Sequence, residues 1–181
     1  MWLKCLFMFF LGTLFGVGSM IWFLVRAFKN KEWYRNLKEL VIYESGKMSG
    51  LSYEAMNTWR KSFSTIIKQV AENSGTNVRV INPVMYYNFD FPRHKSELEV
   101  MNFDLSKVRE SNLVVVNLEG LNTSIGSIIE CYEAYKNNIP VLAFGNNDDY
   151  PELHPWVQCC ITRHDKDYRE CINYIRDFYM T

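Results

Sequence analysis

Glu130 is the side chain of this sequence whose surroundings most clearly suggest chemistry. It follows Ser124 and Ser127 at intervals of three residues, so the three side chains lie along one face of the helix predicted for residues 123–137. Gly126 stands between the two serines, and the first turn of a helix presents backbone N–H groups that have no partner inside it. A carboxylate next to hydroxyl and N–H groups forms a candidate site. Taken alone, Glu130 could equally be a solvated acid on a helix surface.

The loop from Gly46 to Gly50 is a second candidate, because it leads from a predicted strand into a predicted helix. Such a loop presents backbone N–H groups and the positive end of a helix, which suits an anion. Lys47, Ser49 and Ser52 could add hydrogen-bond donors. These residues match no Walker or dinucleotide-binding fingerprint, and an ordinary tight turn with a solvated lysine explains them equally well.

Asp104 is a third candidate. It lies on the helix predicted for residues 96–110, between the apolar residues Phe103 and Leu105. Taken alone, it is more simply explained as an exposed acid on a helix.

Apolar runs and helical periodicity predict the elements that would position these residues. Strands are predicted over 40–45, 77–82, 113–118, 139–144 and 157–162, and helices over 53–73, 96–110, 123–137 and 167–180. Strands that alternate with helices indicate parallel pairing with helical crossovers, hence a doubly wound α/β sheet with the strand order 2-1-3-4-5. In such sheets, ligands bind beyond the carboxyl ends of the strands, which is where the candidates above are expected.

Composition excludes some classes of function. The 181 residues fit one domain of ordinary size, and 20 basic against 20 acidic residues give no net charge, which argues against a nucleic-acid partner. The five cysteines are odd in number and none has C-x-x-C spacing, which favours reduced thiols in a reducing compartment. The three histidines stand apart from one another, so no metal site is predicted.

The N-terminal segment reads as a membrane anchor. Residues 5–25 carry no charge, and a helix of that length spans about 30 Å, the thickness of a bilayer core. Basic residues follow the segment, so the positive-inside rule predicts a single-pass membrane protein with its domain in the cytoplasm. The predicted organisation is an anchor over 1–27, a linker over 28–39 and a domain over 40–181. A cleaved signal peptide is the alternative, although free cysteines fit export poorly.

Five motifs resemble those of one family in their order and spacing. They are IYESGKMSGL (42–51), INP (81–83), FDLSKVRESNLVVVNL (103–118), SIGSIIECYEA (124–134) and IPVLAF (139–144). They resemble the nucleoside 2-deoxyribosyltransferase family, including its deoxynucleoside 5′-monophosphate N-glycosidase branch. The resemblance implies a flavodoxin-like five-stranded parallel sheet, cleavage or transfer at an N-glycosidic bond, no metal or cofactor, and a homo-oligomer of two or more chains.

The resemblance also implies roles for individual residues. Glu130 would be the nucleophile that forms a glycosyl-enzyme intermediate, Asp104 the acid that protonates the departing base, and Tyr43 the group that orients Glu130. The substrate would contact Gly46, Lys47, Ser49, Ser124, Gly126 and Ser127. The position of Ser124 is an aspartate in the nucleoside-using transferases and a serine that touches phosphate in the monophosphate branch, which favours a nucleotide substrate. Base preference, and transfer as opposed to hydrolysis, stay open.

Two residues depart from the family pattern. Glu44 stands where a small uncharged residue is usual, and Lys47 where proline or serine is usual. A buried Glu44 would need a partner, which Lys47 could supply. These departures keep open the alternative of a membrane-anchored nucleotide sensor without turnover. A third hypothesis is a catalytic-glutamate hydrolase of the NAD-cleaving type on a similar sheet.

Overall fold

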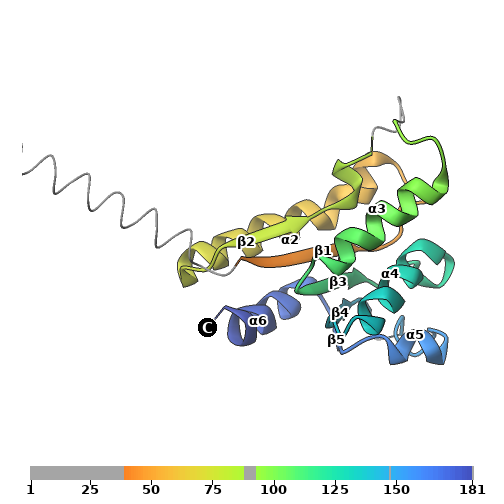
Figure 1. Cartoon of the computed structure of the whole chain (residues 1–181). Coiled ribbons are helices and arrows are strands. Elements are labelled where there is room, and N and C mark those ends of the chain that lie inside the picture. The colour runs from red at the N-terminus through yellow and green to blue at the C-terminus, as the bar shows by residue number, and fades with distance from the viewer. Residues whose placement is uncertain (1–38, 88–92, 147, 181) are drawn as a thin grey trace, which may run out of the picture. The chain divides into compact units, whose positions relative to one another are not determined.

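The structure, a computed structural model, describes residues 39–87, 93–146 and 148–180. They form a five-stranded parallel sheet in the order β2-β1-β3-β4-β5, flanked by helices (Figure 1). The strands are β1 (Leu40–Ser45), β2 (Val78–Ile81), β3 (Leu113–Asn117), β4 (Val141–Phe144) and β5 (Arg163–Asp165). The helices are α2 (Tyr53–Ser74), α3 (Glu97–Arg109), α4 (Ile125–Lys136), α5 (Pro155–Cys159) and α6 (Tyr168–Tyr179), with short 3₁₀ turns η1 (Pro83–Met85) and η2 (Leu121–Thr123). The predicted flavodoxin-like sheet and its strand order are confirmed.

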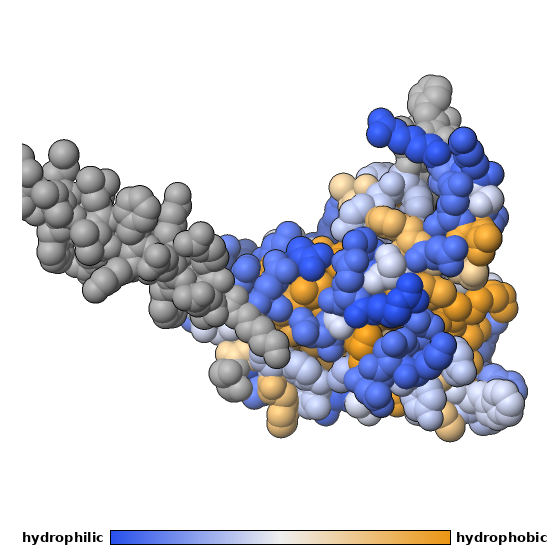
Figure 2. Space-filling model, in the orientation of Figure 1, coloured by the Kyte–Doolittle hydropathy of each residue, from blue (hydrophilic) through white to orange (hydrophobic). Residues whose placement is uncertain are grey.

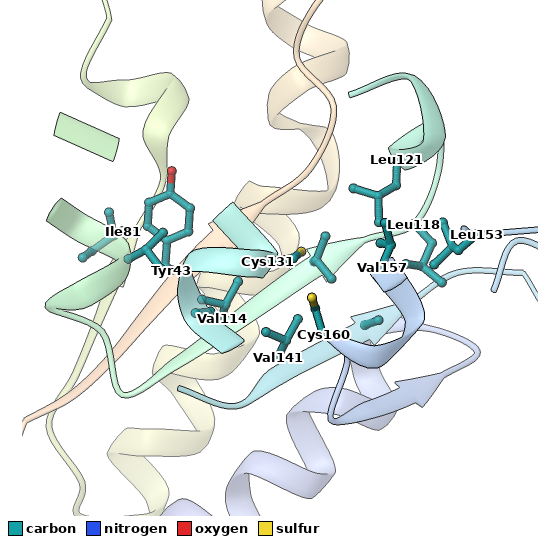
Figure 3. Close-up of a cluster of buried hydrophobic side chains, with 14 of the residues drawn as sticks. Tyr43, Ile81, Val114, Leu118, Leu121, Cys131, Val141, Leu153, Val157 and Cys160 are labelled. Atoms are coloured by element: carbon teal, nitrogen blue, oxygen red, sulfur yellow. The ribbon is translucent and has the colours of Figure 1, made fainter. Parts of the chain in front are cut away.

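The sheet separates two apolar cores. Successive residues of a strand point to opposite faces, so Tyr43 and Val114 face α3, α4 and α5, whereas Ile42 and Val115 face α2 and α6. Figure 3 shows the first of these cores, in which the Tyr43 ring lies beside Ile81 at one end of the cluster. Because both faces are covered, β1, β3 and β4 are almost continuous runs of apolar residues.

The fifth strand differs from its prediction. Residues 157–162 were expected to be extended, but α5 occupies Pro155–Cys159 and the strand is Arg163–Asp165. The reason is local: His154 caps the helix by accepting a hydrogen bond from the Trp156 N–H through Nδ1, and proline is favoured in a first helical turn. The short apolar run has no periodicity that would separate the two possibilities.

The predicted anchor over 1–27, including the apolar residues 5–25, and the linker up to residue 38 lie outside the described residues. Within 39–87, 93–146 and 148–180, no helix combines the length and the apolar character needed to cross a bilayer. On this finding the prediction of a single-pass membrane protein with a cytoplasmic domain is wrong, and no membrane partner or compartment is assigned to the chain.

Candidate active site

The carboxylate of Glu130 is bound from both sides by residues of β1. Its Oε1 accepts a hydrogen bond of 2.8 Å from the Tyr43 hydroxyl, and its Oε2 accepts one of 2.5 Å from Ser45 Oγ. Tyr43 and Ser45 are two residues apart on a strand, so both side chains point to the face that α4 covers. Glu130 is only 6% exposed, so this acid is not the solvated helix residue that the sequence left possible.

Burial dominates the electrostatics of Glu130. It raises the pKa of the carboxyl from 4.5 to about 7, because a charged carboxylate loses its hydration inside the protein. The hydrogen bonds from Ser45 and Tyr43 act in the opposite direction, as does the positive charge of Arg60, whereas the charge of Asp104 raises the pKa further. Burial and the nearby Glu130 hold the pKa of Tyr43 far above its usual value, so Tyr43 stays a hydrogen-bond donor.

Asp104 reaches the same region from α3. It is 7% exposed, and its Oδ1 accepts a hydrogen bond of 2.6 Å from the hydroxyl of Tyr87, which follows η1. Burial raises the pKa of Asp104, and the bond from Tyr87 partly offsets this effect. Asp104 therefore keeps its proton to a higher pH than an exposed aspartate, which is the property a general acid needs.

A cavity of about 460 Å³ opens between α3, the loop after β1 and the start of α4. Its wall contains seven of the residues singled out in the sequence: Gly46, Ser49, Asp104, Ser124, Gly126, Ser127 and Glu130. Two others lie elsewhere. Tyr43 lies behind Glu130 as its hydrogen-bond donor, and Lys47 does not line the cavity.

Lys47 packs against the loop after β3 instead. A Cβ added to Gly120 would lie 2.7 Å from the Lys47 Cδ, so the side chain of Lys47 covers the place where Gly120 lacks one. The pairing of Lys47 with Glu44 suggested by the sequence is absent from the described residues. Glu44 Oε1 accepts a hydrogen bond of 2.9 Å from Ser64 Oγ, and the nearby charges that act on it are those of Arg60 and Lys68.

The first turn of α4 offers donors to the cavity. No side chain caps this helix, because Ser124 Oγ and Ser127 Oγ bond to each other at 2.9 Å instead. The first N–H groups of the helix therefore lack a capping side chain. A Cβ at Gly126 would meet no atom within 4 Å, which leaves open space in front of this turn. Hydroxyl groups, N–H groups and the positive end of a helix dipole together suit an anion.

A second cavity of about 490 Å³ lies beside the first, and Val100 lines both. Two edge-to-face ring pairs contribute to its wall: Tyr86 with Phe103, whose centroids are 5.6 Å apart, and Tyr87 with His94, at 5.9 Å. Such walls suit a flat apolar ring. Because Tyr87 lines this cavity and bonds to Asp104, the acid lies where the two cavities meet.

Among the described residues, no three His, Cys, Asp or Glu side chains are placed so that they could hold a metal ion.

Sequence reasoning missed three residues that the structure brings to the site: Ser45, Tyr87 and Arg60. Alternation on β1 from Tyr43 could have identified Ser45. Nothing in the sequence pointed to the other two.

Comparison with known proteins shows the fold. A conserved protein from Enterococcus faecalis V583 is similar, with a TM-score of 0.61 and 16% identity over 77% of this chain and 99% of that one. The chain is also similar to the 2-deoxyribosyltransferase of Bacillus psychrosaccharolyticus, with a TM-score of 0.48 and 16% identity over 74% and 91% of the two chains. The CMP N-glycosidase of Clostridium botulinum has a TM-score of 0.45 and 13% identity over 76% and 99%.

No protein-family model matches the sequence, and no curated protein matches it. At 16% identity, the similarity to the Enterococcus structure shows a common fold and nothing more. No conclusion is drawn from the other two structures, whose TM-scores are below 0.5. The chemistry of the site rests on its own geometry.

Proposed function

We propose that this protein cleaves or transfers at the N-glycosidic bond of a nucleoside or nucleoside 5′-monophosphate. The observation that carries the proposal is the carboxylate of Glu130, which is bound by Tyr43 and Ser45 and lines a cavity that Asp104 also lines. The sequence motifs that resemble the nucleoside 2-deoxyribosyltransferase family assign the same two acids to catalysis. Most enzymes that hydrolyse glycosidic bonds use a pair of carboxyl groups, one on each side of the bond that breaks.

In the first step, an oxygen of Glu130 attacks C1′ of the sugar, and the bond from C1′ to the base nitrogen breaks. The electron pair of that bond moves to the base, which takes a proton from Asp104. Each Glu130 oxygen has two lone pairs, so the bonds from Tyr43 and Ser45 orient the carboxylate and leave a lone pair for attack. Negative charge at Glu130 also stabilises the oxocarbenium-like transition state.

In the second step, water or an acceptor base attacks C1′ of the glycosyl-enzyme. Asp104, now ionised, takes the proton of the attacking group, and the carboxylate of Glu130 leaves. The site thus returns to its starting protonation state. Hydrolysis and transfer differ only in which of the two acceptors reaches C1′.

In this proposal, the sugar and the base of the substrate bind in different cavities. The sugar lies over Glu130 in the cavity of about 460 Å³, and the base extends past Asp104 towards the aromatic walls of the second cavity. A 5′-phosphate fits the uncapped start of α4, where Ser124, Ser127 and backbone N–H groups donate and no carboxylate stands at position 124.

The test is release of free base by the full-length chain from a panel of deoxynucleosides, ribonucleosides and their 5′-monophosphates, followed by chromatography. NAD belongs in the panel, since release of nicotinamide alone would identify a glycohydrolase of the NAD-cleaving kind. Release from at least one nucleoside or monophosphate, and its loss in Glu130→Gln, are expected. Glu133→Gln is the matched control, because Glu133 lies on the same helix but pairs with Arg109 at 2.8 Å.

If no substrate releases base at high protein concentration, the enzymatic proposal fails. A rise in melting temperature with a monophosphate, without product, would then identify a nucleotide-binding protein without turnover.

A further inference from the structure

Behind the candidate site, on the opposite face of β1, lie two buried ionisable side chains that the proposed reaction does not use, Glu44 and Arg60. Glu44 stands between Tyr43 and Ser45 on the strand, so its side chain points towards α2 instead of α4. There it lies near Arg60, and both residues are fully buried. Removing an arginine and a glutamate from water costs free energy, which the contacts of the two residues must offset.

Arg60 is bound mainly to backbone. Its Nη2 donates a hydrogen bond of 2.9 Å to the carbonyl of Gly46, and its Nη1 donates to the carbonyl of Met56. Trp59 lies against it, with the guanidinium carbon 4.7 Å from the ring centroid. Arg60 does not line the cavity, but the residue it holds does.

Gly46 needs this support. Its φ of +154° is a conformation that residues with a side chain rarely adopt, and an added Cβ would approach Trp59, Arg60 and Asn117 within 3.3–3.4 Å. Gly46 begins the loop that carries Ser49 to the cavity wall. A fixed carbonyl at Gly46 therefore fixes the direction in which the loop leaves β1.

The charge of Arg60 also acts across the strand. Four groups influence the ionisation of Glu130: Ser45 and Tyr43 by hydrogen bonds, and Asp104 and Arg60 by their charge. Arg60 is the positive member of this set and favours the ionised carboxylate that attacks C1′. Glu44, Glu130 and Tyr43 are in turn the groups that act on Arg60, while Ser64 and Lys68 act on Glu44.

We propose that Arg60 is the positioning residue of this site: it holds the Gly46 loop against the cavity through the backbone and keeps a positive charge behind Glu130. The inference rests on the proposed function. Arg60 touches no substrate; it acts through Gly46 and through its field.

The test uses three full-length variants: Arg60→Lys, Glu44→Gln, and the double variant Glu44→Gln/Arg60→Met. The double variant removes both buried ionisable groups, so neither is left in the interior without the other. Glu44→Gln alone is its matched control. Two quantities are measured: KM for the substrate found in the panel, and the titration midpoint of the Glu130 carboxyl carbon by ¹³C NMR, which needs no substrate.

In the double variant, relative to Glu44→Gln, we expect KM to rise about tenfold and the Glu130 midpoint to rise by about one pH unit, the effect of losing a nearby opposite charge. Arg60→Lys keeps the positive charge but loses the planar guanidinium that bonds to the carbonyls of Met56 and Gly46. Its KM should therefore rise, while the titration midpoint of Glu130 stays close to that of wild type. An unchanged midpoint in the folded double variant would overturn the proposal, and so would an unchanged KM.

The titration also separates this inference from the proposed function. If wild type releases no base from any substrate, the proposed reaction fails, but the Glu130 midpoint still reports whether Arg60 acts on that carboxyl. An unmoved midpoint in the double variant overturns the inference whatever the panel shows.

Discussion

The hydroxyl of Tyr43 and the carboxylate of Glu130, 87 positions apart in the chain, meet at 2.8 Å where β1 and α4 come together. The bond is buried, and it joins β1, an inner strand of the sheet, to the helix that carries Glu130. It therefore sets both the direction of the carboxylate and part of its acidity.

Tyr43→Phe should lower kcat/KM and shift its pH dependence. A hydrogen bond to a charged group contributes about 1.5–3 kcal/mol, so a loss of roughly ten- to hundredfold is expected. The bond lowers the pKa of Glu130, which is about 7 in the protein, so removing it should move the acidic limb of the pH profile to higher pH. Tyr135→Phe, an exposed tyrosine on the same helix as Glu130, is the control, and an unshifted limb in Tyr43→Phe would contradict the assignment.

Glu130 should carry the covalent intermediate. A 2-fluoro-2-deoxy sugar with a good leaving group slows the second step, so mass spectrometry of the full-length chain should find the added sugar on the peptide that contains Glu130. Glu130→Gln should take up no label and lose at least about a thousandfold in kcat, as expected for loss of a nucleophile. Label on another residue, or none on wild type that turns over the substrate, would rule out this nucleophile.

Asp104→Asn should slow release of poor leaving groups most. General acid catalysis contributes about 10²–10⁴-fold, and a base that departs without a proton needs less of it. The variant should therefore keep more of its kcat on a substrate with an activated leaving group than on the natural one. Glu110→Gln, an exposed acid next to the same helix, serves as the comparison. Equal losses on both substrates would argue that Asp104 only shapes the cavity.

Glu44 should make the fold less stable at alkaline pH. Burial raises its pKa from 4.5 to about 8, so the folded state holds a proton that the unfolded state releases between these values. The stability from this proton is complete below pH 4.5 and is lost as the pH rises through 8. Glu130 adds the same trend up to about pH 7.

Glu44→Gln cannot ionise, so its melting temperature should fall less than that of wild type between pH 5 and pH 8.5. The difference should reach several degrees, since 1 kcal/mol corresponds to about 2–4 °C in a domain of this size. Thermal melts of both proteins across this range are the measurement, with Glu39→Gln as an exposed control. Parallel curves for wild type and Glu44→Gln would show that Glu44 has an ordinary pKa.

A homo-oligomer stays a prediction, and the surface next to the site gives a way to test it. Leu98 and Met101 of α3 are apolar, yet they are 60% and 41% exposed. Figure 2, in which α3 and α4 face the viewer, shows apolar residues at the surface among polar ones. Exposed apolar residues in a cluster are typical of an interface. Light scattering should give a mass above that of one chain, and Leu98→Lys/Met101→Lys should lower it.

The sequence predicted the parts of the fold that local pattern decides. The strand over residues 40–45 and the helix that carries Glu130 lie where the sequence predicted them, and the predicted strand order is the observed one. The fifth strand was wrong because the mostly apolar residues 157–162 fit either element, and the His154 cap favours a helix.

The missing parts of the site are those that depend on contacts between distant residues. Arg60 reads as one more polar residue of an amphipathic helix, and only the approach of the Gly46 carbonyl gives it a partner. Tyr87 lies in an irregular aromatic stretch, where no pattern tells which ring will reach Asp104. Lys47 had a plausible charge for substrate binding, but its side chain packs over Gly120.

The outermost strand at the β4 side of the sheet is β5, with three residues, Arg163, His164 and Asp165. A sheet that ends in an exposed strand offers its free N–H and C=O groups to any other extended chain. Here the ladder is short, and an arginine and an aspartate joined by an ion pair occupy two of its three positions. This margin therefore offers another extended chain only a short template for edge-to-edge pairing.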